Sequence, residues 1–295
     1  MAEVDEEAIR REMEAVMQQR HEAEPTPVEP PLFEQNERSN VRHVIGVVSG
    51  KGGVGKSFVT GIIAVELART GARVGILDAD VTGPSIPRMF GIAHDRAFSD
   101  GDAIVPVETA GGIKVMSANL VLENETDPVV WRGPVVSGAL KQFWSDTAWG
   151  DIDYLLVDMP PGTSDVALTV FQSLPIEGVV IVSSPQDLVQ MVVGKAIKMA
   201  QLMRVPVLGI VENMAYIECE HCGERSWPFG PSKLAETAAG YNVNALGQLP
   251  LSARFAELAD AGRFEDDLDK DLLPEVIDSI EIVARFNEAK QGASE

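Results

Sequence analysis

The feature that most constrains this chain is the glycine-rich stretch GKGGVGKS at residues 50–57. It fits the pattern G-x-x-x-x-G-K-[ST], in which glycines allow backbone N–H groups to wrap around a phosphate. The apolar run HVIGVV precedes it and a helical pattern follows it, which is the strand–loop–helix context that a phosphate-binding loop requires. We expect Lys56 to reach the β- and γ-phosphates of a nucleotide and Ser57 to place its hydroxyl on Mg²⁺. The predicted nucleotide-binding residues of this loop are Gly50, Lys51, Gly52, Gly53, Val54, Gly55, Lys56 and Ser57.

Beyond residue 42, short apolar runs alternate with helical patterns. The runs are rich in β-branched residues and apolar on both faces, as are the strands of a parallel sheet that helices cover on both sides. The alternation therefore predicts an α/β fold with a doubly wound, mostly parallel sheet and helices on both faces. The predicted strands are 43–48, 73–80, 153–160, 178–184 and 205–211, and the predicted helices lie near 57–70, 134–146, 187–203, 231–239, 252–261 and 272–288. The stretch AIVPVETAGGIKVMSANL, within residues 94–130, suggests a hairpin or an edge strand.

The chain divides by composition into a short N-terminal part and one large domain. Residues 1–23 contain a predicted short acidic helix, whose apolar residues recur at spacings of four and three. Residues 24–41 are rich in proline and show no periodicity, which is typical of a linker. The rest is predicted to be a phosphate-loop ATPase domain at 42–290, which includes the cysteine motif, and a tail at 291–295.

Composition limits the partners and the compartment. The 295 residues carry 24 basic and 45 acidic side chains, for a formal net charge of −21. Such a surface repels the phosphates of nucleic acids and anionic lipids, so we expect neither partner. No run approaches the roughly 18 apolar residues of a membrane span. The acidic start MAEVDEEAIRREMEAV also lacks the basic-then-apolar plan of a signal peptide, so the predicted location is the cytoplasm.

Three aspartates at strand ends complete the predicted nucleotide site. LDAD contains Asp78 and Asp80, and LLVDMPPGTSD contains Asp158, each motif at the end of a predicted strand. Because ligands bind at the carboxyl ends of parallel strands, we expect these carboxylates beside the phosphate loop. Asp80 is predicted to orient the attacking water, whereas Asp78 and Asp158 are predicted to act on Mg²⁺ directly or through water. Residues 161–163 are expected to sense the γ-phosphate and to shift on hydrolysis.

A second lysine, Lys51, directly follows the first glycine of the loop. Within one loop its charge would crowd that of Lys56. We therefore expect Lys51 to reach the nucleotide of a facing subunit and to neutralise charge that grows in the transition state, as an arginine finger does. The active form is thus predicted to be a homodimer with ATP at its interface, and the predicted catalytic residues are Lys51, Lys56 and Asp80.

With these residues in place, the chain resembles the deviant P-loop ATPases marked by KGGxGK[ST], which have the P-loop NTPase fold. Among nitrogenase iron protein, the chromosome-partition and septum-positioning ATPases and the Mrp/ApbC iron–sulfur cluster carriers, it is most similar to the carriers. The shared stretches are SGKGGVGKS (49–57), LDADVTGPSIPRMFGI (77–92), WRGP (131–134), YLLVDMPPGTSD (154–165), VENM (211–214) and CEHCGE (219–224). The resemblance implies that Lys51 acts across a dimer and that Asn213 contacts the adenine. Phe58 departs from the pattern, because a second small hydroxyl residue is usual there, and we expect a packing change.

The chain has two cysteines, Cys219 and Cys222, in the run CEHCGE. If the homodimer forms, two chains supply four thiolates, enough for one [4Fe–4S] cluster. Gly223 allows a sharp turn in which N–H groups face the sulfurs. Zinc held by the same four sulfurs is an alternative. Thiol–disulfide exchange is another, although the three neighbouring glutamates are expected to oppose bare thiolates. We expect His221 to face solvent.

Two classes of function are left. The first is an ATP-binding and hydrolysing iron–sulfur cluster carrier, which assembles a [4Fe–4S] cluster between two subunits and transfers it to apo-proteins. The alternative is a partition- or positioning-type ATPase switch with a dimer-bridging structural zinc. A switch that binds DNA or membrane needs a basic surface. Residues 251–295 instead carry five basic and twelve acidic side chains, which favours the carrier.

Overall fold

The computed structural model describes residues 32–81, 83, 85–122, 133–162, 164–185 and 189–292. The predicted N-terminal helix and residues 24–31 of the predicted linker lie outside the described residues, as do Thr163 and the last three residues of the predicted tail. Within the described ranges, no helix combines the length and the apolar character that crossing a bilayer requires.

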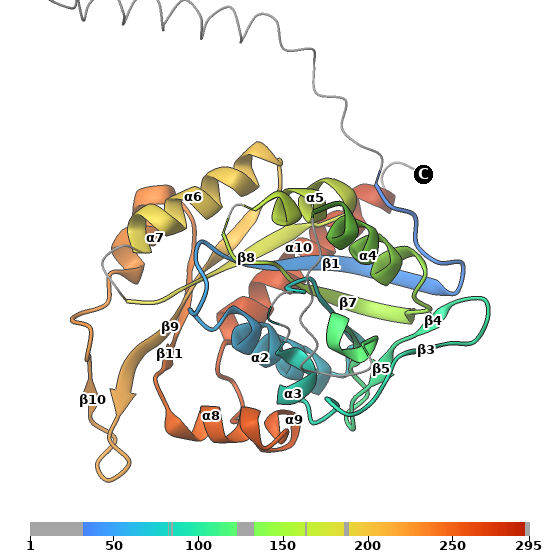
Figure 1. The fold of residues 1–295 in the computed structure, drawn as a ribbon. Helices are drawn as coiled ribbons and strands as arrows, with labels where there is room; N and C mark the ends of the chain where they lie inside the picture. Colours follow the sequence, from blue (N-terminus) through green and yellow to red (C-terminus); the bar gives the residue numbers. More distant parts are fainter. Residues whose placement is uncertain are drawn as a thin grey trace, which may run out of the picture. The chain divides into compact units, whose positions relative to one another are not determined.

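A nine-stranded sheet forms the centre of the domain (Figure 1). Its strands are β1 (Ser39–Ser49), β2 (Val74–Asp78), β5 (Val107–Glu108), β6 (Lys114–Met116), β7 (Gly150–Asp158), β8 (Gly178–Ser183), β9 (Val207–Glu218), β10 (Arg225–Ser226) and β11 (Ala245–Pro250). They follow the order β10-β9-β8-β1-β7-β2-β6-β5, and β11 pairs with β9 beside this path. β5 and β10 run antiparallel to their neighbours, whereas the other pairs are parallel. Two short strands, β3 (Phe98–Ser99) and β4 (Ile104–Val105), pair separately.

Helices cover both faces of this sheet, as predicted. They are α2 (Lys56–Arg69), α3 (Ile86–Met89), α4 (Gly133–Ser145), α5 (Asp165–Ser173), α6 (Val189–Leu202), α7 (Leu234–Tyr241), α8 (Ala253–Asp260), α9 (Phe264–Asp267) and α10 (Pro274–Gly292), with a 3-10 turn at Ala118–Leu120. One core contains α4, α5, α6 and α7, and the other contains α2, α3, α8, α9 and α10. Successive strand residues point to opposite faces, so Val44 joins the first core and Ile45 the second. The doubly wound, mostly parallel architecture is confirmed.

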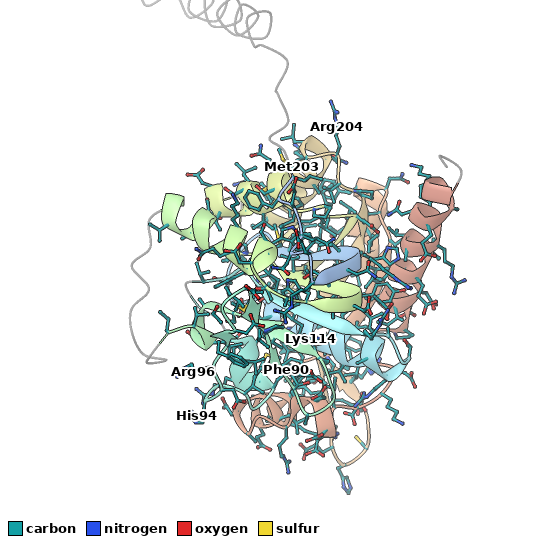
Figure 2. All side chains as sticks on the ribbon, turned by 90° about the vertical axis from the view of Figure 1, so that its right-hand side faces the viewer. Phe90, His94, Arg96, Lys114, Met203 and Arg204 are labelled. Carbon is teal, nitrogen blue, oxygen red and sulfur yellow. The ribbon has the colours of Figure 1, made fainter. Side chains whose placement is uncertain are left out.

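Side chains fill the space between the sheet and the helices (Figure 2). Phe90 lies within the second core, whereas His94 and Arg96 lie at the rim and are exposed. Lys114 lies inside the outline of the domain, where its Nζ donates to the carbonyl of Trp149 at 2.7 Å. Its hydrogen bond therefore ties β6, the neighbour of the edge strand β5, to the residue that precedes β7.

The central strand β1 begins at Ser39, so it includes the last three residues of the predicted linker. The early residues pair with Gly150–Ile152 of β7 through the backbone. Their side chains add polar contacts, because Ser39 Oγ donates to the carbonyl of Thr147 at 2.9 Å and Asn40 Nδ2 to Asp151 Oδ1 at 2.9 Å. A polar strand end of this kind carries no apolar pattern.

Most predicted strands and helices lie where the sequence placed them, but among the described helices and strands α3, α5, α9, β10 and β11 were not predicted. β11 reads ALGQLP, with a glycine and a proline in an edge position where few apolar residues are needed. The uncertain region between 94 and 130 contains the antiparallel pair β5–β6 at the other edge of the sheet, which confirms the expected hairpin or edge strand.

Candidate functional site

The phosphate loop joins β1 to α2 at the carboxyl end of the sheet, in the predicted context. Gly55 precedes the first turn of α2 with a φ of 81°, a conformation that glycine adopts without steric cost. An added Cβ at Gly50 would overlap Val192 of α6, and one at Gly55 would overlap the amide of Asn213. Val192 and Asn213 therefore pack closely against the loop. The loop leads directly into the N-terminus of α2, where anions are favoured.

Lys56 and Ser57 converge on Asp158, the carboxylate at the end of β7. Lys56 Nζ lies 2.7 Å from Asp158 Oδ1 and 4.0 Å from Asp80 Oδ2. Ser57 Oγ donates to Asp158 Oδ2 at 2.5 Å, and Thr60 Oγ1 donates to Asp158 Oδ1 at 2.8 Å. Hydroxyl and carboxylate oxygens are the ligands that Mg²⁺ prefers, so Ser57 and Asp158 together fit the predicted ion. Four of the predicted residues, Lys56, Ser57, Asp80 and Asp158, thus lie together.

Asp78 lies beneath this group and is completely buried. It is the register partner of Asp158 in the β2–β7 pair, and its Oδ2 accepts a hydrogen bond from Ser117 Oγ at 3.1 Å. Burial, and then the negative charge of Asp158, raise the pKa of Asp78 to about 8. The N–H of Asp80 donates to Asp78 Oδ1 at 3.2 Å, so Asp78 also fixes the turn that carries Asp80.

The loop opens into a cavity of about 390 Å³. Its walls come from the phosphate loop, from α3 and its preceding turn, and from the end of α8. The lining residues are Ser49, Gly52, Gly53, Gly55, Lys56, Ser57, Phe58, Asp80, Gly83, Ser85, Arg88, Met89, Pro161, Ala259 and Asp260. The walls from α3 and α8 were not predicted, although α3 lies within the stretch 77–92 that carries the family resemblance.

Phe58 joins the phosphate loop to the α8–α9 region. Its ring centroid lies 5.1 Å from that of Phe255 on α8 and 5.1 Å from that of Phe264 on α9. Phe90 extends the cluster with a centroid distance of 5.8 Å to Phe264. The expected packing change at residue 58 is confirmed, since the aromatic ring fills space that a small hydroxyl residue would leave.

The loop after β7 is tied to the phosphate loop through the backbone. Gly162 N–H donates to the carbonyl of Ser49 at 2.8 Å, and Met159 N–H donates to the carbonyl of Val47 at 3.0 Å. Gly162 has a φ of 77°. A displacement of either loop must therefore break or carry along these hydrogen bonds, which suits the predicted sensing of the γ-phosphate.

The two cysteines lie in the tight loop that connects β9 to β10, on a hairpin that extends from the sheet in Figure 1. Cys219 N–H donates to the carbonyl of Glu224 at 2.9 Å, and Gly223 N–H donates to the carbonyl of Cys219 at 2.8 Å. Gly223 has a φ of 71°, which confirms the sharp turn. Both thiols are exposed, and so is His221, as expected.

Backbone N–H groups face the sulfur of Cys219. Hydrogen bonds from the N–H groups of Cys222 and His221, and from the Cys222 side chain, lower the pKa of the Cys219 thiol, against a smaller opposing effect of Glu220. Glu220 therefore opposes the Cys219 thiolate as expected, but the hydrogen-bond donors outweigh it, so the net effect favours the thiolate. No group of three or more histidine, cysteine or acidic side chains within the described ranges could hold a metal ion, so the pair lacks further ligands there.

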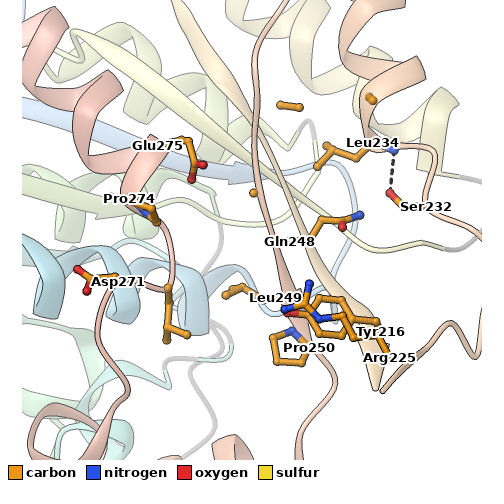
Figure 3. A pocket seen from close by; sticks show the side chains of 14 residues that line it. Tyr216, Arg225, Ser232, Leu234, Gln248, Leu249, Pro250, Asp271, Pro274 and Glu275 are labelled. Carbon is orange, nitrogen blue, oxygen red and sulfur yellow. Dashed lines mark hydrogen bonds between the residues drawn. The ribbon is translucent and has the colours of Figure 1, made fainter. Parts of the chain in front are cut away.

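Side-chain contacts join the two strands at the base of this hairpin. The guanidinium of Arg225 lies 4.3 Å from the ring centroid of Tyr216, and its Nε donates to Glu218 Oε2 at 3.3 Å. Figure 3 shows Tyr216 and Arg225 side by side next to Pro250, at one end of a second cavity of about 710 Å³ along β11. The residues before and after the cysteine loop are thus linked to each other.

A family model described as "ParA: NUBPL iron-transfer P-loop NTPase" matches residues 40–281. The chain belongs to this family. An iron-sulfur cluster carrier protein of Clostridium perfringens is 53% identical over 234 residues, which cover 77% of this chain and 82% of the relative. The carrier protein of Methanocaldococcus jannaschii is 44% identical over 225 residues, covering 76% and 78%. The resemblance to the iron–sulfur cluster carriers is confirmed.

Solved structures agree with this assignment. A nucleotide-binding protein of Archaeoglobus fulgidus, solved in complex with ADP, is 44% identical with a TM-score of 0.70, and the match covers 78% of this chain and 90% of that one. The cell division protein MinD of Aquifex aeolicus has a TM-score of 0.53 at 18% identity over 84% and 97% of the chains, which indicates a shared fold alone. This member of the iron–sulfur cluster carrier family therefore has a P-loop NTPase fold with a MinD-like sheet.

Asn213 and Lys51, the two residues to which the resemblance assigns roles, both make hydrogen bonds at the phosphate loop itself. Asn213 is buried behind the phosphate loop, where its Nδ2 donates to the carbonyl of Val54 at 3.0 Å and its Oδ1 accepts from Met214 N–H at 2.9 Å. Lys51 is half-buried, and its carbonyl accepts a hydrogen bond from Ser49 Oγ at 3.0 Å. The adenine contact of Asn213 and the action of Lys51 across a dimer remain predictions.

Proposed function

We propose that this protein is an ATP-hydrolysing carrier that holds one [4Fe–4S] cluster between two copies and transfers it to apo-proteins in the cytoplasm. The observation that supports this most is the exposed hairpin, which presents Cys219 and Cys222 without a third ligand in the described part of the chain. Two thiols leave half of a cluster's ligand positions to another chain. A second copy related by two-fold symmetry supplies an identical pair.

The polar groups around the phosphate loop have distinct roles in the proposed hydrolysis of ATP. With Mg·ATP bound, Lys56 exchanges Asp158 for the β- and γ-phosphates, and Ser57 and Asp158 hold Mg²⁺ directly or through water. Asp80 orients the attacking water, while Asp78 keeps the turn of Asp80 in place. Lys51 of the facing subunit neutralises charge in the transition state.

Coupling between the two sites runs along β9. Asn213 on this strand packs against the phosphate loop, and Cys219 directly follows the strand's last residue. Six residues of extended chain span about 20 Å. Hydrolysis that shifts the phosphate loop would therefore move the root of the cysteine hairpin, and two facing hairpins that move apart would release the cluster.

Anaerobic purification with iron, sulfide and zinc analysis, an absorption spectrum and a mass measurement tests the cluster. We expect a brown dimer with about four irons and four sulfides. Cys222→Ser should lose the iron and the transfer of cluster to an apo-dehydratase, whereas His221→Ala, a change at an exposed neighbour, should retain both. A protein that holds zinc and no iron after reconstitution would instead support a switch with a structural zinc.

Mixing two inactive variants tests the role of Lys51. Lys51→Ala lacks the group that acts across the dimer, and Lys56→Ala lacks the group that acts within its own site. A mixed dimer then contains one intact site, so equimolar mixing should restore about a quarter of the wild-type ATPase rate. A mixture as inactive as its two components would refute action across the dimer.

A further inference from the structure

An ion pair forms part of the wall of the nucleotide cavity. Arg88 on α3 and Asp260 on α8 both line this cavity together with Lys56, and Arg88 Nη2 lies 3.2 Å from Asp260 Oδ1. The two side chains are 64% and 72% exposed, so solvent screens their attraction. An exposed pair contributes little to folding stability, and its charges are available to a ligand that enters the cavity.

The wall that carries this pair has a fixed position. Gly91 and Gly262 follow the two helices with φ values of 70° and 66°, and an added Cβ at Gly91 would lie 2.7 Å from the carbonyl oxygen of Gly262. Only residues without a Cβ permit the two turns to approach this closely. The ring of Phe58 also joins α8 to the first turn of α2 through Phe255. The glycine contact thus fixes the ends of α3 and α8 against each other, and the Phe58 contact fixes α8 against the start of α2.

A polyphosphate in the cavity would weaken the ion pair between Arg88 and Asp260. Its negative charge attracts a guanidinium, which forms bidentate hydrogen bonds with phosphate, and repels a carboxylate. Three carboxylates, Asp80, Asp158 and Asp260, already lie in or beside the cavity wall. Arg88 is the side chain that offsets the last of these.

We propose that Arg88 is a phosphate-contacting residue of the nucleotide site in its own subunit, and that Asp260 competes with the nucleotide for its guanidinium. This inference rests on the proposed binding of ATP. It assigns the two residues opposite effects on affinity, although both belong to one ion pair. Nucleotide entry draws Arg88 from Asp260 to the phosphates, and ATP, with its additional charge, draws it more strongly than ADP.

Fluorescent nucleotide titration and steady-state ATPase kinetics on the full-length protein test this proposal. Arg88→Ala should raise the Kd and KM for Mg·ATP about three- to tenfold, with a smaller effect on ADP and a smaller effect on kcat. Asp260→Asn should lower the same Kd about two- to fivefold. Both effects should shrink as KCl is raised over a range in which circular dichroism shows no change in fold.

A matched control is Arg254→Ala on the same helix α8, whose guanidinium pairs with Asp269 at 2.9 Å and is not among the described residues that line the cavity. It should leave the Kd unchanged. A merely structural ion pair predicts that Arg88→Ala and Asp260→Asn shift the Kd in the same direction, and that result, or no shift in either, overturns the inference. A wild-type protein that binds no nucleotide overturns the proposed function as well, so the two failures are distinguishable.

Discussion

The aromatic ring of Phe58 makes a quantitative prediction about the link between the phosphate loop and α8. Phe58→Thr restores the small hydroxyl residue that is usual at this position and removes a half-buried ring with two aromatic neighbours at 5.1 Å. Complete burial of a phenylalanine is worth about 3–5 kcal/mol against alanine, and each aromatic pair adds about 0.5–1.5 kcal/mol. Because this ring is only half-buried, we expect a loss of about 2–3 kcal/mol.

Thermal unfolding followed by circular dichroism measures this loss. For a domain of this size, about 1 kcal/mol corresponds to about 2 °C in Tm, so Phe58→Thr should lower Tm by about 4–6 °C. Phe286→Ala is the control, because that ring on α10 is 59% exposed and its removal should cost less than about 0.5 kcal/mol. If the two variants lose equal stability, the ring does not support α8 and the packing argument is wrong.

Three further changes have definite expected outcomes. His43 hydrogen bonds Glu177 at 2.9 Å and a glutamate of α10 at 3.4 Å, and these partners raise its pKa above the unfolded value of about 6.5. Wild-type protein should therefore be more stable than His43→Gln by the full amount below pH 6.5, and this difference in the free energy of unfolding should disappear as the pH rises through the higher folded pKa. Denaturant titrations at several pH values measure the difference. Gly55→Ala places a Cβ at a φ of 81° against a buried amide and should weaken ATP binding at least about tenfold by calorimetry, whereas Gly240→Ala, with open space around it, should not. Gly223→Ala, at a φ of 71°, costs about 1 kcal/mol or more in the cysteine loop, so the anaerobically purified variant should hold less iron than the wild-type protein.

Features that depend on neighbouring residues in the chain could be predicted from the sequence. The phosphate loop needs its glycines, lysine and serine in one short run, and the cysteine loop needs Cys219, Cys222 and Gly223 at a fixed spacing. Asp158 could be placed beside Lys56 because parallel strands end at one edge of the sheet. The structure confirms that placement with a distance of 2.7 Å.

Features that depend on contacts between distant segments could not be predicted. The pairing of Arg88 with Asp260 depends on how α3 meets α8, and no periodicity or motif encodes that meeting. The raised pKa of Asp78 depends on complete burial and on its register partner, which the sequence does not specify. β11 was missed because an edge strand with glycine and proline has neither an alternating nor a continuous apolar pattern.

The distinction between local motifs and contacts of distant segments also matters for how a carrier of this kind can work. Each site is local, since the nucleotide loop and the cysteine loop are compact runs of sequence, whereas their coupling requires a connection between them. In the proposed mechanism β9 would provide it, because the strand that packs Asn213 against the loop carbonyl of Val54 continues to Glu218 and then to Cys219. Arg225 closes the other side of the hairpin onto Tyr216 of that same strand. A strand held at two points, Asn213 and Tyr216, would transmit displacement better than a flexible linker. The contacts that the sequence could not predict are therefore the ones on which nucleotide-dependent release would depend.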